Sequence, residues 1–335
     1  MEKSAVAGND YLLDIQDLDV DFEKQPGLAR ALRGVDIRLH AGETHALVGE
    51  SGSGKTVTSM CIMGLLSMPP GRVNRGKIIF QKRDLLQLNE NERREVRGKD
   101  IAMIFQEPGK YLNPAYKIGE QITESLILHL EMRKKAAAEK ALELLDLVGL
   151  GKNRRVLKSY PHELSGGMKQ RAMIAMAIAC NPALLIADEP TTALDVTLQL
   201  QILRLLLKLK EKFAMSILFI SHDLGVVKEI ADRISVIYAG KIIESATKGQ
   251  LFENALHPYT KLLLLSIPDA TKRGERLRAI PGTVPDAEDV PPGCSFHPRC
   301  PLAEDECRVA IPPDIDYGAG HQAACFLIGK KWIHS

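Results

Sequence analysis

One eight-residue segment has the residue types and the spacing of a phosphate-binding loop. It reads Gly49-Glu50-Ser51-Gly52-Ser53-Gly54-Lys55-Thr56. Its glycines allow backbone N–H groups to converge on phosphate oxygens, its lysine can reach the β- and γ-phosphates, and its threonine hydroxyl can ligate Mg²⁺. An apolar run over residues 46–48 precedes the segment and a helix-like stretch over residues 57–66 follows it, as such a loop requires. The segment predicts a site for a nucleoside triphosphate.

Three later apolar runs each end in polar groups that suit phosphate or metal chemistry. These groups are Gln106, then Asp188 with Glu189, and finally His222. Because parallel α/β sheets place ligand contacts at the carboxyl ends of their strands, we expect Asp188 to anchor Mg²⁺ and Glu189 to polarise an attacking water. We expect Gln106 to coordinate Mg²⁺ or orient water, and His222 to contact the γ-phosphate. The alternatives are an exposed loop glutamine and a structural histidine.

Two other features could bind parts of a nucleotide. Ser165 is a good N-cap, and Gly166 and Gly167 expose bare amides in the first turn of a helix-like stretch that continues to residue 179. This turn predicts a second anion-binding helix start, with a capped core helix as the alternative. Phe22 could stack on an adenine ring or belong to the core.

Charge and hydropathy limit the classes of function. The chain has 335 residues, and its 44 Lys and Arg nearly balance its 42 Asp and Glu. No overall field therefore favours nucleic acid or an anionic membrane. The N-terminus has no signal-peptide pattern, and no apolar run approaches the ~20 residues that a membrane span requires. We expect a cytosolic protein without a nucleic-acid partner, held at a membrane only by other subunits.

Residue patterning predicts an α/β fold. Alternating runs predict a small antiparallel sheet before the phosphate loop, at residues 12–15, 18–22 and 32–39. Residues 72–80 predict a further strand, and residues 90–97 a charged helix. Amphipathic helices over residues 118–159 are typical of an insertion into an α/β domain, and residues 196–213 predict a long helix.

Four of the six cysteines lie close to the C-terminus, at Cys294, Cys300, Cys307 and Cys325. Their segment is rich in proline and glycine and needs a metal or a cross-link to hold a fold. A cytosolic location favours metal over disulfides. The spacing is neither that of zinc ribbons nor that of ferredoxins, so iron–sulfur, zinc and unligated or disulfide-bonded cysteines all remain open. The other two, Cys61 and Cys180, are expected as buried structural thiols.

The order of these motifs resembles that of the ATPase subunits of ABC transporters, over residues 11–255. The resemblance implies that Phe22 is the A-loop, residues 49–56 the Walker A motif and Gln106 the Q-loop. It also implies a signature motif at residues 164–168 and a Walker B strand with its catalytic glutamate at residues 184–189. A D-loop at residues 193–195 and a switch histidine at residue 222 follow. Met168 stands where many members have glutamine, which leaves the serine and glycines of the signature intact.

The resemblance also implies a fold and a mechanism. The fold is an ABC-type P-loop core with a mostly parallel sheet, an N-terminal antiparallel β subdomain and a helical subdomain inserted at about residues 107–170. Two subunits face each other head to tail, and the signature of each caps the partner's ATP. Asp195 is a further nucleotide-binding residue. Thr56, Gln106 and Asp188 hold Mg²⁺, and Lys55 neutralises charge on the phosphates. Glu189 activates water, and His222 holds it in line with the γ-phosphate.

The tail resembles the oligopeptide, dipeptide and nickel branch of this family, and the dipeptide transporter ATPases most of all. The stretches that carry this resemblance are His257-Pro258-Tyr259-Thr260 and residues 280–285 and 294–301. They imply an ATPase domain over residues 1–256 and an extension over residues 257–335. They also imply a [4Fe–4S] cluster on the four clustered cysteines.

The resemblance implies partners as well. These are a second homologous ATPase in a heterodimer, two membrane permease subunits and, indirectly, an extracytoplasmic peptide-binding protein, all at the cytoplasmic face of the inner membrane. Residues 105–114 and the helical insertion would grip a coupling helix of a permease. The expected function is ATP-driven import of dipeptides or oligopeptides. Import of nickel or another small solute, a non-transport ABC ATPase and a nucleotide sensor without turnover are the alternatives.

Overall fold

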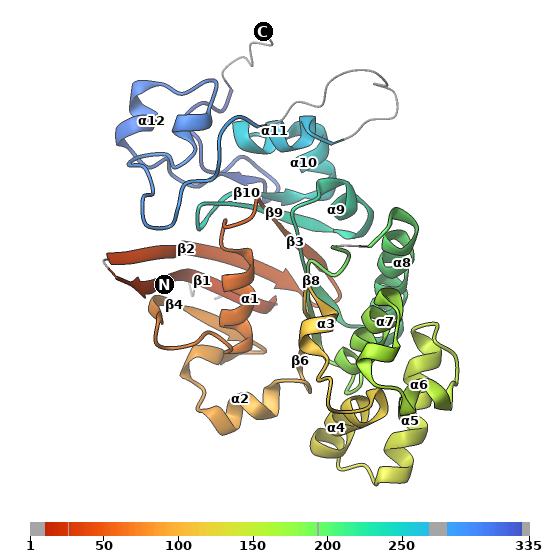
Figure 1. The fold of residues 1–335 in the computed structure, drawn as a ribbon. Helices are drawn as coiled ribbons and strands as arrows, with labels where there is room; N and C mark the ends of the chain where they lie inside the picture. Colours follow the sequence, from red (N-terminus) through yellow and green to blue (C-terminus); the bar gives the residue numbers. More distant parts are fainter. Residues whose placement is uncertain (1–10, 26, 193, 268–279, 330–335) are drawn as a thin grey trace, which may run out of the picture.

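The computed structural model describes residues 11–25, 27–192, 194–267 and 280–329. Within these ranges the chain forms a four-stranded and an eight-stranded β-sheet (Figure 1). One hydrophobic core lies between the two sheets and includes Leu47 and Ile62, and a second core covers the other face of the large sheet. No helix of the described ranges combines the length and the hydropathy that crossing a membrane requires.

The small sheet is antiparallel and has the order β2-β1-β4-β5. Its strands are β1 (Tyr11–Lys24), β2 (Gly27–His40), β4 (Gly71–Phe80) and β5 (Arg83–Asp84). The two runs predicted at residues 12–15 and 18–22 are one strand, because a shift of register between Ile15 and Leu18 accommodates Asp17 at φ 45° as a bulge. Alternation therefore continues across the bulge and buries Leu13, Ile15 and Leu18.

The large sheet places the phosphate loop and the polar strand ends at one edge. Its order is β11-β12-β10-β9-β3-β8-β7-β6. The strands are β3 (Thr44–Val48), β6 (Ile101–Ile104), β7 (Leu184–Asp188), β8 (Ser216–Ser221), β9 (Arg233–Tyr238), β10 (Lys241–Thr247), β11 (Ile315–Asp316) and β12 (Gln322–Ala323). Strands β9, β3, β8, β7 and β6 are parallel neighbours, so their carboxyl ends meet.

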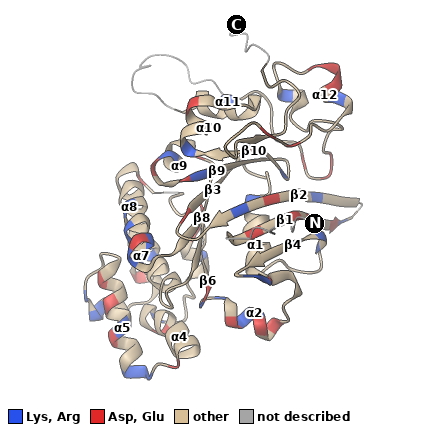
Figure 2. Ribbon diagram, turned by 180° about the vertical axis from the view of Figure 1, so that it is seen from behind, with Lys and Arg blue, Asp and Glu red and all other residues tan. Residues whose placement is uncertain are grey.

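The predicted helices are present, and the structure adds short helices at residues 108–111, 224–230, 248–254, 258–265 and 305–309. The helices of the inserted subdomain lie between β6 and β7 and are α3 (Pro108–Tyr111), α4 (Ile118–Leu130), α5 (Lys134–Leu147), α6 (Arg154–Lys158) and α7 (Gly166–Ala177). The others are α1 (Lys55–Met63), α2 (Glu90–Val96), α8 (Val196–Phe213), α9 (Leu224–Ile230), α10 (Lys248–Asn254), α11 (Pro258–Leu265) and α12 (Asp305–Val309). Figure 2 shows acidic and basic residues interspersed along α2 and α5, as the balanced composition predicts.

The C-terminal extension is joined to the large sheet. Its strand β12 pairs with β10, and its residue Phe296 is buried in the core that covers the sheet. Buried Glu244 of β10 accepts hydrogen bonds from the backbone N–H groups of Leu256 and His257, at 2.7 and 2.9 Å, and lies 2.8 Å from His321 Nε2. The extension therefore packs as part of the sheet's core.

Two fully buried histidines make the stability of the protein depend on pH. Burial lowers the pKa of His45 to about 3 and that of His257 to about 4. Both pKa values lie below the ~6.5 of a histidine in an unfolded chain. At a pH between the folded and the unfolded pKa values, these two histidines therefore bind protons only in the unfolded state. We expect the free energy of unfolding to fall as the pH drops from 7 to 5, by about 2 kcal/mol for each histidine.

Urea unfolding at pH 7 and pH 5 measures this loss. In the wild type, the N–H of Tyr259 donates to His257 Nδ1 at 3.0 Å, and the side-chain oxygen of the His257→Asn variant can accept the same hydrogen bond. Because this variant has no imidazole at position 257, its loss of stability between pH 7 and pH 5 should be about 2 kcal/mol smaller. Exposed His162 provides the control, because His162→Gln should leave the pH dependence unchanged. An equal loss in the His257→Asn variant would contradict the assignment.

Candidate active site

The phosphate loop takes a path that requires glycine at both ends. A Cβ atom on Gly49 would lie 2.3 Å from the carbonyl oxygen of Ile237 in β9. Gly54 has φ 107°, and a Cβ atom there would lie 2.9 Å from the carbonyl oxygen of Ala31 in β2. The loop backbone therefore packs directly on both sheets and leads into α1 at Lys55.

Lys55 lies beneath the loop with its ammonium group facing the loop carbonyls. Its Nζ donates to the carbonyl oxygens of Gly49 at 2.8 Å and Glu50 at 2.9 Å, and lies 4.0 Å from Glu189 Oε1. Burial lowers the pKa of Lys55, and the nearby carboxylates, Glu189 first among them, oppose that change. The side chain is thereby positioned to meet phosphate oxygens above the loop.

Glu189 brings together the polar strand ends that the sequence predicts. Gln106 Nε2 and Thr192 Oγ1 each donate to its Oε2 at 2.9 Å, and His222 Nδ1 lies 3.2 Å from its Oε1. The hydrogen bond from His222 is the main reason that the pKa of Glu189 is lowered and that of His222 is raised. Glu189 itself has φ 45°, a strained conformation for a residue other than glycine and one that is common at active sites.

Asp188 and Thr56 form a fitting place for Mg²⁺. Burial raises the pKa of Asp188 to about 6, and a hydrogen bond from Thr56 opposes that change. Oδ1 of Asp188 is buried and has no hydrogen-bond partner among the described residues. An unpaired carboxylate oxygen beside a hydroxyl is a suitable donor set for a hard cation.

One cavity joins these groups. It is lined by residues 50–52 and 54–57, by four groups at the strand ends, and by Ala31 and Ala287, whereas Asp188 does not line it. The four strand-end groups are Gln106, Glu189, Thr192 and His222. Phe22 does not line this cavity: it lies on β1 opposite Ala29 and Gly71, half-buried against the core between the sheets.

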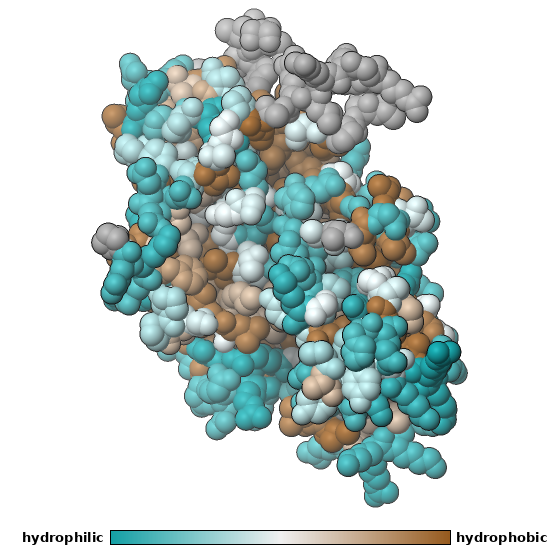
Figure 3. All heavy atoms as spheres, in the orientation of Figure 1, coloured by the Kyte–Doolittle hydropathy of each residue, from teal (hydrophilic) through white to brown (hydrophobic). Residues whose placement is uncertain are grey.

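The signature turn lies outside the cavity. Exposed Ser165 caps α7, accepting a hydrogen bond from the N–H of Met168 at 3.3 Å, and a Cβ atom on Gly166 would meet open space. Asp195 caps α8 in the same way and is also exposed, while Ala193 of the predicted D-loop lies outside the described residues. Val196 at the start of α8 is 73% exposed, and Figure 3 shows apolar surface over this helix.

The four clustered cysteines line one small hollow in the extension, together with His257 and Phe296. Burial raises the pKa of Cys300 to about 12 and that of Cys325 to about 11, and the neighbouring thiols add to both shifts. In the described part of the chain, no three His, Cys, Asp or Glu side chains are close enough together to hold a single metal ion. Cys61, in the core between the sheets, and Cys180 are both buried thiols, as predicted.

Three contacts of the loop region were not predicted from the sequence. The hydroxyl of Thr192 bonds to Glu189, and both Tyr259 and Arg299 bond to Glu50. Thr192 follows Glu189 by three residues, which is a local signal. Tyr259 and Arg299 are more than 200 residues from the loop, and the sequence offered only their family motifs.

The loop, its lysine and the Glu189 cluster define a P-loop ATPase, and comparisons with known proteins agree. A model of the ABC transporter family matches residues 32–192, and a model of the oligopeptide/dipeptide transporter C-terminal region matches residues 243–307. The chain is 50% identical to the oligopeptide transport ATP-binding protein AppD of Bacillus subtilis, over 96% of this chain and 98% of that one. It is 47% identical to the dipeptide transport ATP-binding protein DppD of the same organism, over 97% of both chains.

A solved structure supports the same assignment. The dimeric structure of an ATP-binding cassette in a post-hydrolysis state, bound to ADP and Pi, is similar to this chain with a TM-score of 0.64. The identity is 27%, over 70% of this chain and 98% of that one. The chain belongs to the ATP-binding proteins of ABC transporters, in the branch that carries the oligopeptide/dipeptide C-terminal region.

Replacing the carboxylate of Glu189 tests its role. Glu189→Gln keeps the shape of the side chain and one accepting oxygen but removes the base, so ATP should still bind while hydrolysis falls at least about a hundredfold. Phosphate release and equilibrium binding of ATP measure the two effects. Thr192→Val, which removes only one hydrogen bond to the same carboxylate, should have a smaller effect. Turnover at the wild-type rate in Glu189→Gln would remove Glu189 from the reaction.

Proposed function

We propose that this chain binds and hydrolyses ATP to power the import of peptides through an ABC transporter. The single observation that carries the proposal is the contact of Glu189 with Gln106, Thr192 and His222 at the mouth of the phosphate loop. The relatives are named as oligopeptide and dipeptide transport ATP-binding proteins, which supports a peptide as cargo. Nickel or another small solute is the alternative, because an ATPase of this kind does not touch the cargo.

The side chains have separate roles in this reaction. Glu189, ionised because its pKa is lowered, accepts a proton from the attacking water. His222 and Gln106 orient that water, and Lys55 neutralises charge that develops on the phosphates. Thr56, Asp188 and Gln106 would hold Mg²⁺, which supplies further neutralisation of phosphate charge when it is bound. Phe22 would stack on the adenine beyond the rim of the loop cavity, which it does not itself line.

We further propose a head-to-tail dimer of ATPase subunits, with a second, homologous chain as the partner. Ser165, Gly166 and Asp195 are exposed and belong to no wall of the loop cavity, so they need another subunit to meet ATP. The start of α7 offers free backbone amides to an anion, and Val196 offers apolar surface beside it. A related cassette, whose structure is dimeric with ADP and Pi bound, is a precedent for this arrangement.

ATP should therefore drive association of the subunits. In the Glu189→Gln background, where ATP is not consumed, we expect the apparent mass to double when MgATP and the partner subunit are added. Ser165→Arg should abolish this gain because its bulk fills the space in which the phosphates would meet the bare amides at the start of α7. Light scattering after size exclusion measures the mass, and Leu128→Arg on α4 is the matched surface control. Association that survives Ser165→Arg would contradict the dimer.

Permease subunits are the proposed membrane partners, with the chain held peripherally at the cytoplasmic face. Tyr111 and Tyr116 are 49% and 55% exposed, and the ring of Phe105 stacks on Tyr111 at 3.9 Å, next to Gln106. This exposed aromatic surface suits a coupling helix, and its position beside Gln106 would connect docking to the ATP site. An extracytoplasmic peptide-binding protein would deliver the cargo from the other side.

We also propose a [4Fe–4S] cluster on Cys294, Cys300, Cys307 and Cys325. All four thiols border one hollow, which supports a shared ligand. Four cysteines are the ligand number of a [4Fe–4S] cluster, and four cysteines also suit a structural zinc ion.

Iron analysis and absorbance of anaerobically purified protein test the cluster. The wild type should be brown and contain about four irons per chain, and Cys325→Ser should lose both the colour and the iron. Cys180→Ala, which removes a cysteine outside the hollow, should retain them. A colourless wild type free of iron would refute the cluster, and one equivalent of zinc would replace it with a zinc site.

A further inference from the structure

Arg299 of the extension binds the side chain of Glu50 in the phosphate loop. Its Nη1 and Nη2 donate to the two carboxylate oxygens of Glu50 at 3.0 and 3.1 Å, as a parallel pair of hydrogen bonds. The Arg299 side chain is 6% exposed and that of Glu50 31% exposed. Nε of Arg299 donates to the carbonyl oxygen of Pro281 at 2.8 Å, and Nη1 also lies 3.3 Å from Tyr238 Oη. The guanidinium is thus fixed in orientation on several sides.

The extension also binds the backbone of the same loop residue. The N–H of Glu50 donates to the hydroxyl of Tyr259, in α11, at 3.2 Å. The ring of Tyr259 is fully buried and packs edge-on against Tyr238 and Phe296, at 4.7 and 5.2 Å between ring centroids. The carbonyl of Glu50 in turn accepts the hydrogen bond from Lys55 Nζ. Tyr259 and Arg299 of the extension therefore hold Glu50 in place. The carbonyl of Glu50 in turn orients the phosphate-binding lysine.

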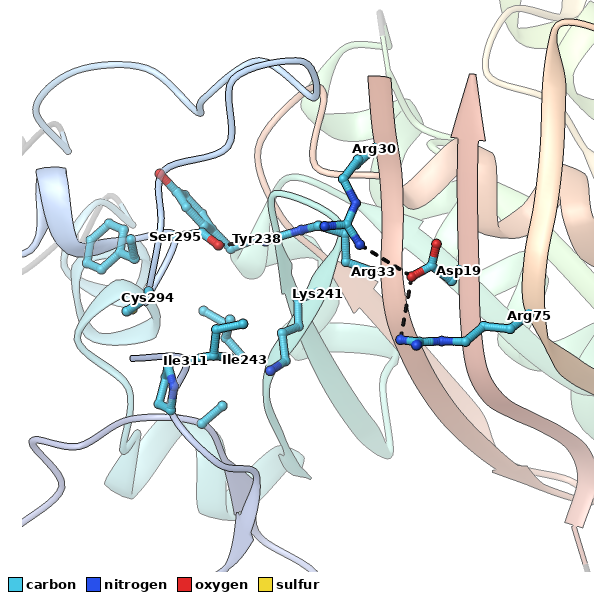
Figure 4. Close-up of a pocket in the computed structure, with 14 residues that line it drawn as sticks. Asp19, Arg30, Arg33, Arg75, Tyr238, Lys241, Ile243, Cys294, Ser295 and Ile311 are labelled. Atoms are coloured by element: carbon cyan, nitrogen blue, oxygen red, sulfur yellow. Dashed lines mark hydrogen bonds and ion pairs between the residues drawn. The ribbon is translucent and has the colours of Figure 1, made fainter. Parts of the chain in front are cut away.

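A second set of contacts joins the extension to β2, beside the same cavity. The N–H of Arg30 donates to the carbonyl oxygen of Ala287 at 2.7 Å, and Ala31 and Ala287 both line the loop cavity. Figure 4 shows the side chain of Arg33 reaching Ser295, to which its Nη2 donates at 2.5 Å. Ser295 follows Cys294, and Arg299 precedes Cys300, so both anchors lie between the first two clustered cysteines.

The charge of Glu50 gives the contact a consequence beyond packing. Without Arg299, the Glu50 carboxylate would remain unpaired beside the phosphate loop. It would then repel the phosphates of ATP, because like charges interact strongly where water is partly excluded. A structural link alone would change the stability of the fold, whereas this contact also changes the field at the phosphates.

We propose that Arg299 is a positioning residue of the phosphate loop, so that the cysteine-bearing extension sets the affinity of this site for ATP. The proposal rests on the proposed function, namely that the loop binds ATP. The extension thereby lines part of the ATP site and holds its phosphate loop in place. Arg299 acts through Glu50 and does not touch the reacting atoms.

Kinetics of four variants test the proposal on the full-length chain. Arg299→Ala should raise KM and Kd for ATP about tenfold and leave kcat within about twofold. Arg299→Lys keeps the charge but loses the paired hydrogen bonds, so it should recover part of the affinity. Adding Glu50→Gln to Arg299→Ala should restore the affinity for ATP, because the double variant has no unpaired carboxylate at position 50 to repel the phosphates. Arg308→Ala, on exposed α12 of the same extension, should change neither constant.

The outcomes separate this proposal from the proposed function. A wild type that fails to bind ATP refutes the function itself. A wild type that binds ATP, with a folded Arg299→Ala variant of equal KM, refutes only the role of Arg299. Equal defects in Arg299→Ala with and without Glu50→Gln would also refute it, because the repelling charge would then be irrelevant. If Arg299→Ala does not fold, Arg299→Lys and Tyr259→Phe keep the packing and must each still raise KM.

Discussion

The close packing of the phosphate loop on the two sheets is the constraint on which the rest of the site depends. Gly49 faces the carbonyl of Ile237 in β9 and Gly54 faces that of Ala31 in β2, with no space for a side chain at either position. The loop is therefore held from both sides before any ligand arrives. This preorganisation fixes the start of α1 and the position of Lys55, and it brings β2 and the extension to the rim of the same cavity.

Contacts of the Glu189 side chain hold this residue beside the loop in a strained backbone conformation. Its backbone has an unfavourable φ of 45°, while its carboxylate contacts Gln106 just after β6, His222 just after β8, and Thr192 of its own turn. Such strain persists only where the surrounding structure determines it, and here the surroundings are the carboxyl ends of parallel strands. The carboxylate stays ionised because His222 and Thr192 bond to it, which suits a base that takes a proton from water.

The sequence predicts the parts of the site that are set by local structure. The loop, Gln106, Asp188, Glu189 and His222 each follow an apolar strand, and parallel pairing then brings them together. Contacts between distant segments could not be predicted, since nothing near Glu50 indicates Arg299. The bulge at Asp17 was missed for a different reason, because a polar interruption of the alternation looks the same whether a strand ends or bulges.

The central claim is that the loop and the Glu189 cluster bind one ATP with its metal. A crystal structure of the Glu189→Gln variant with Mg²⁺ and ATP tests it most directly. The account predicts a triphosphate within hydrogen-bond distance of Lys55 Nζ, a metal ion beside Thr56 and Asp188, and Arg299 still bound to residue 50. A nucleotide bound elsewhere, or a metal ion without contact to Thr56 and Asp188, would contradict it.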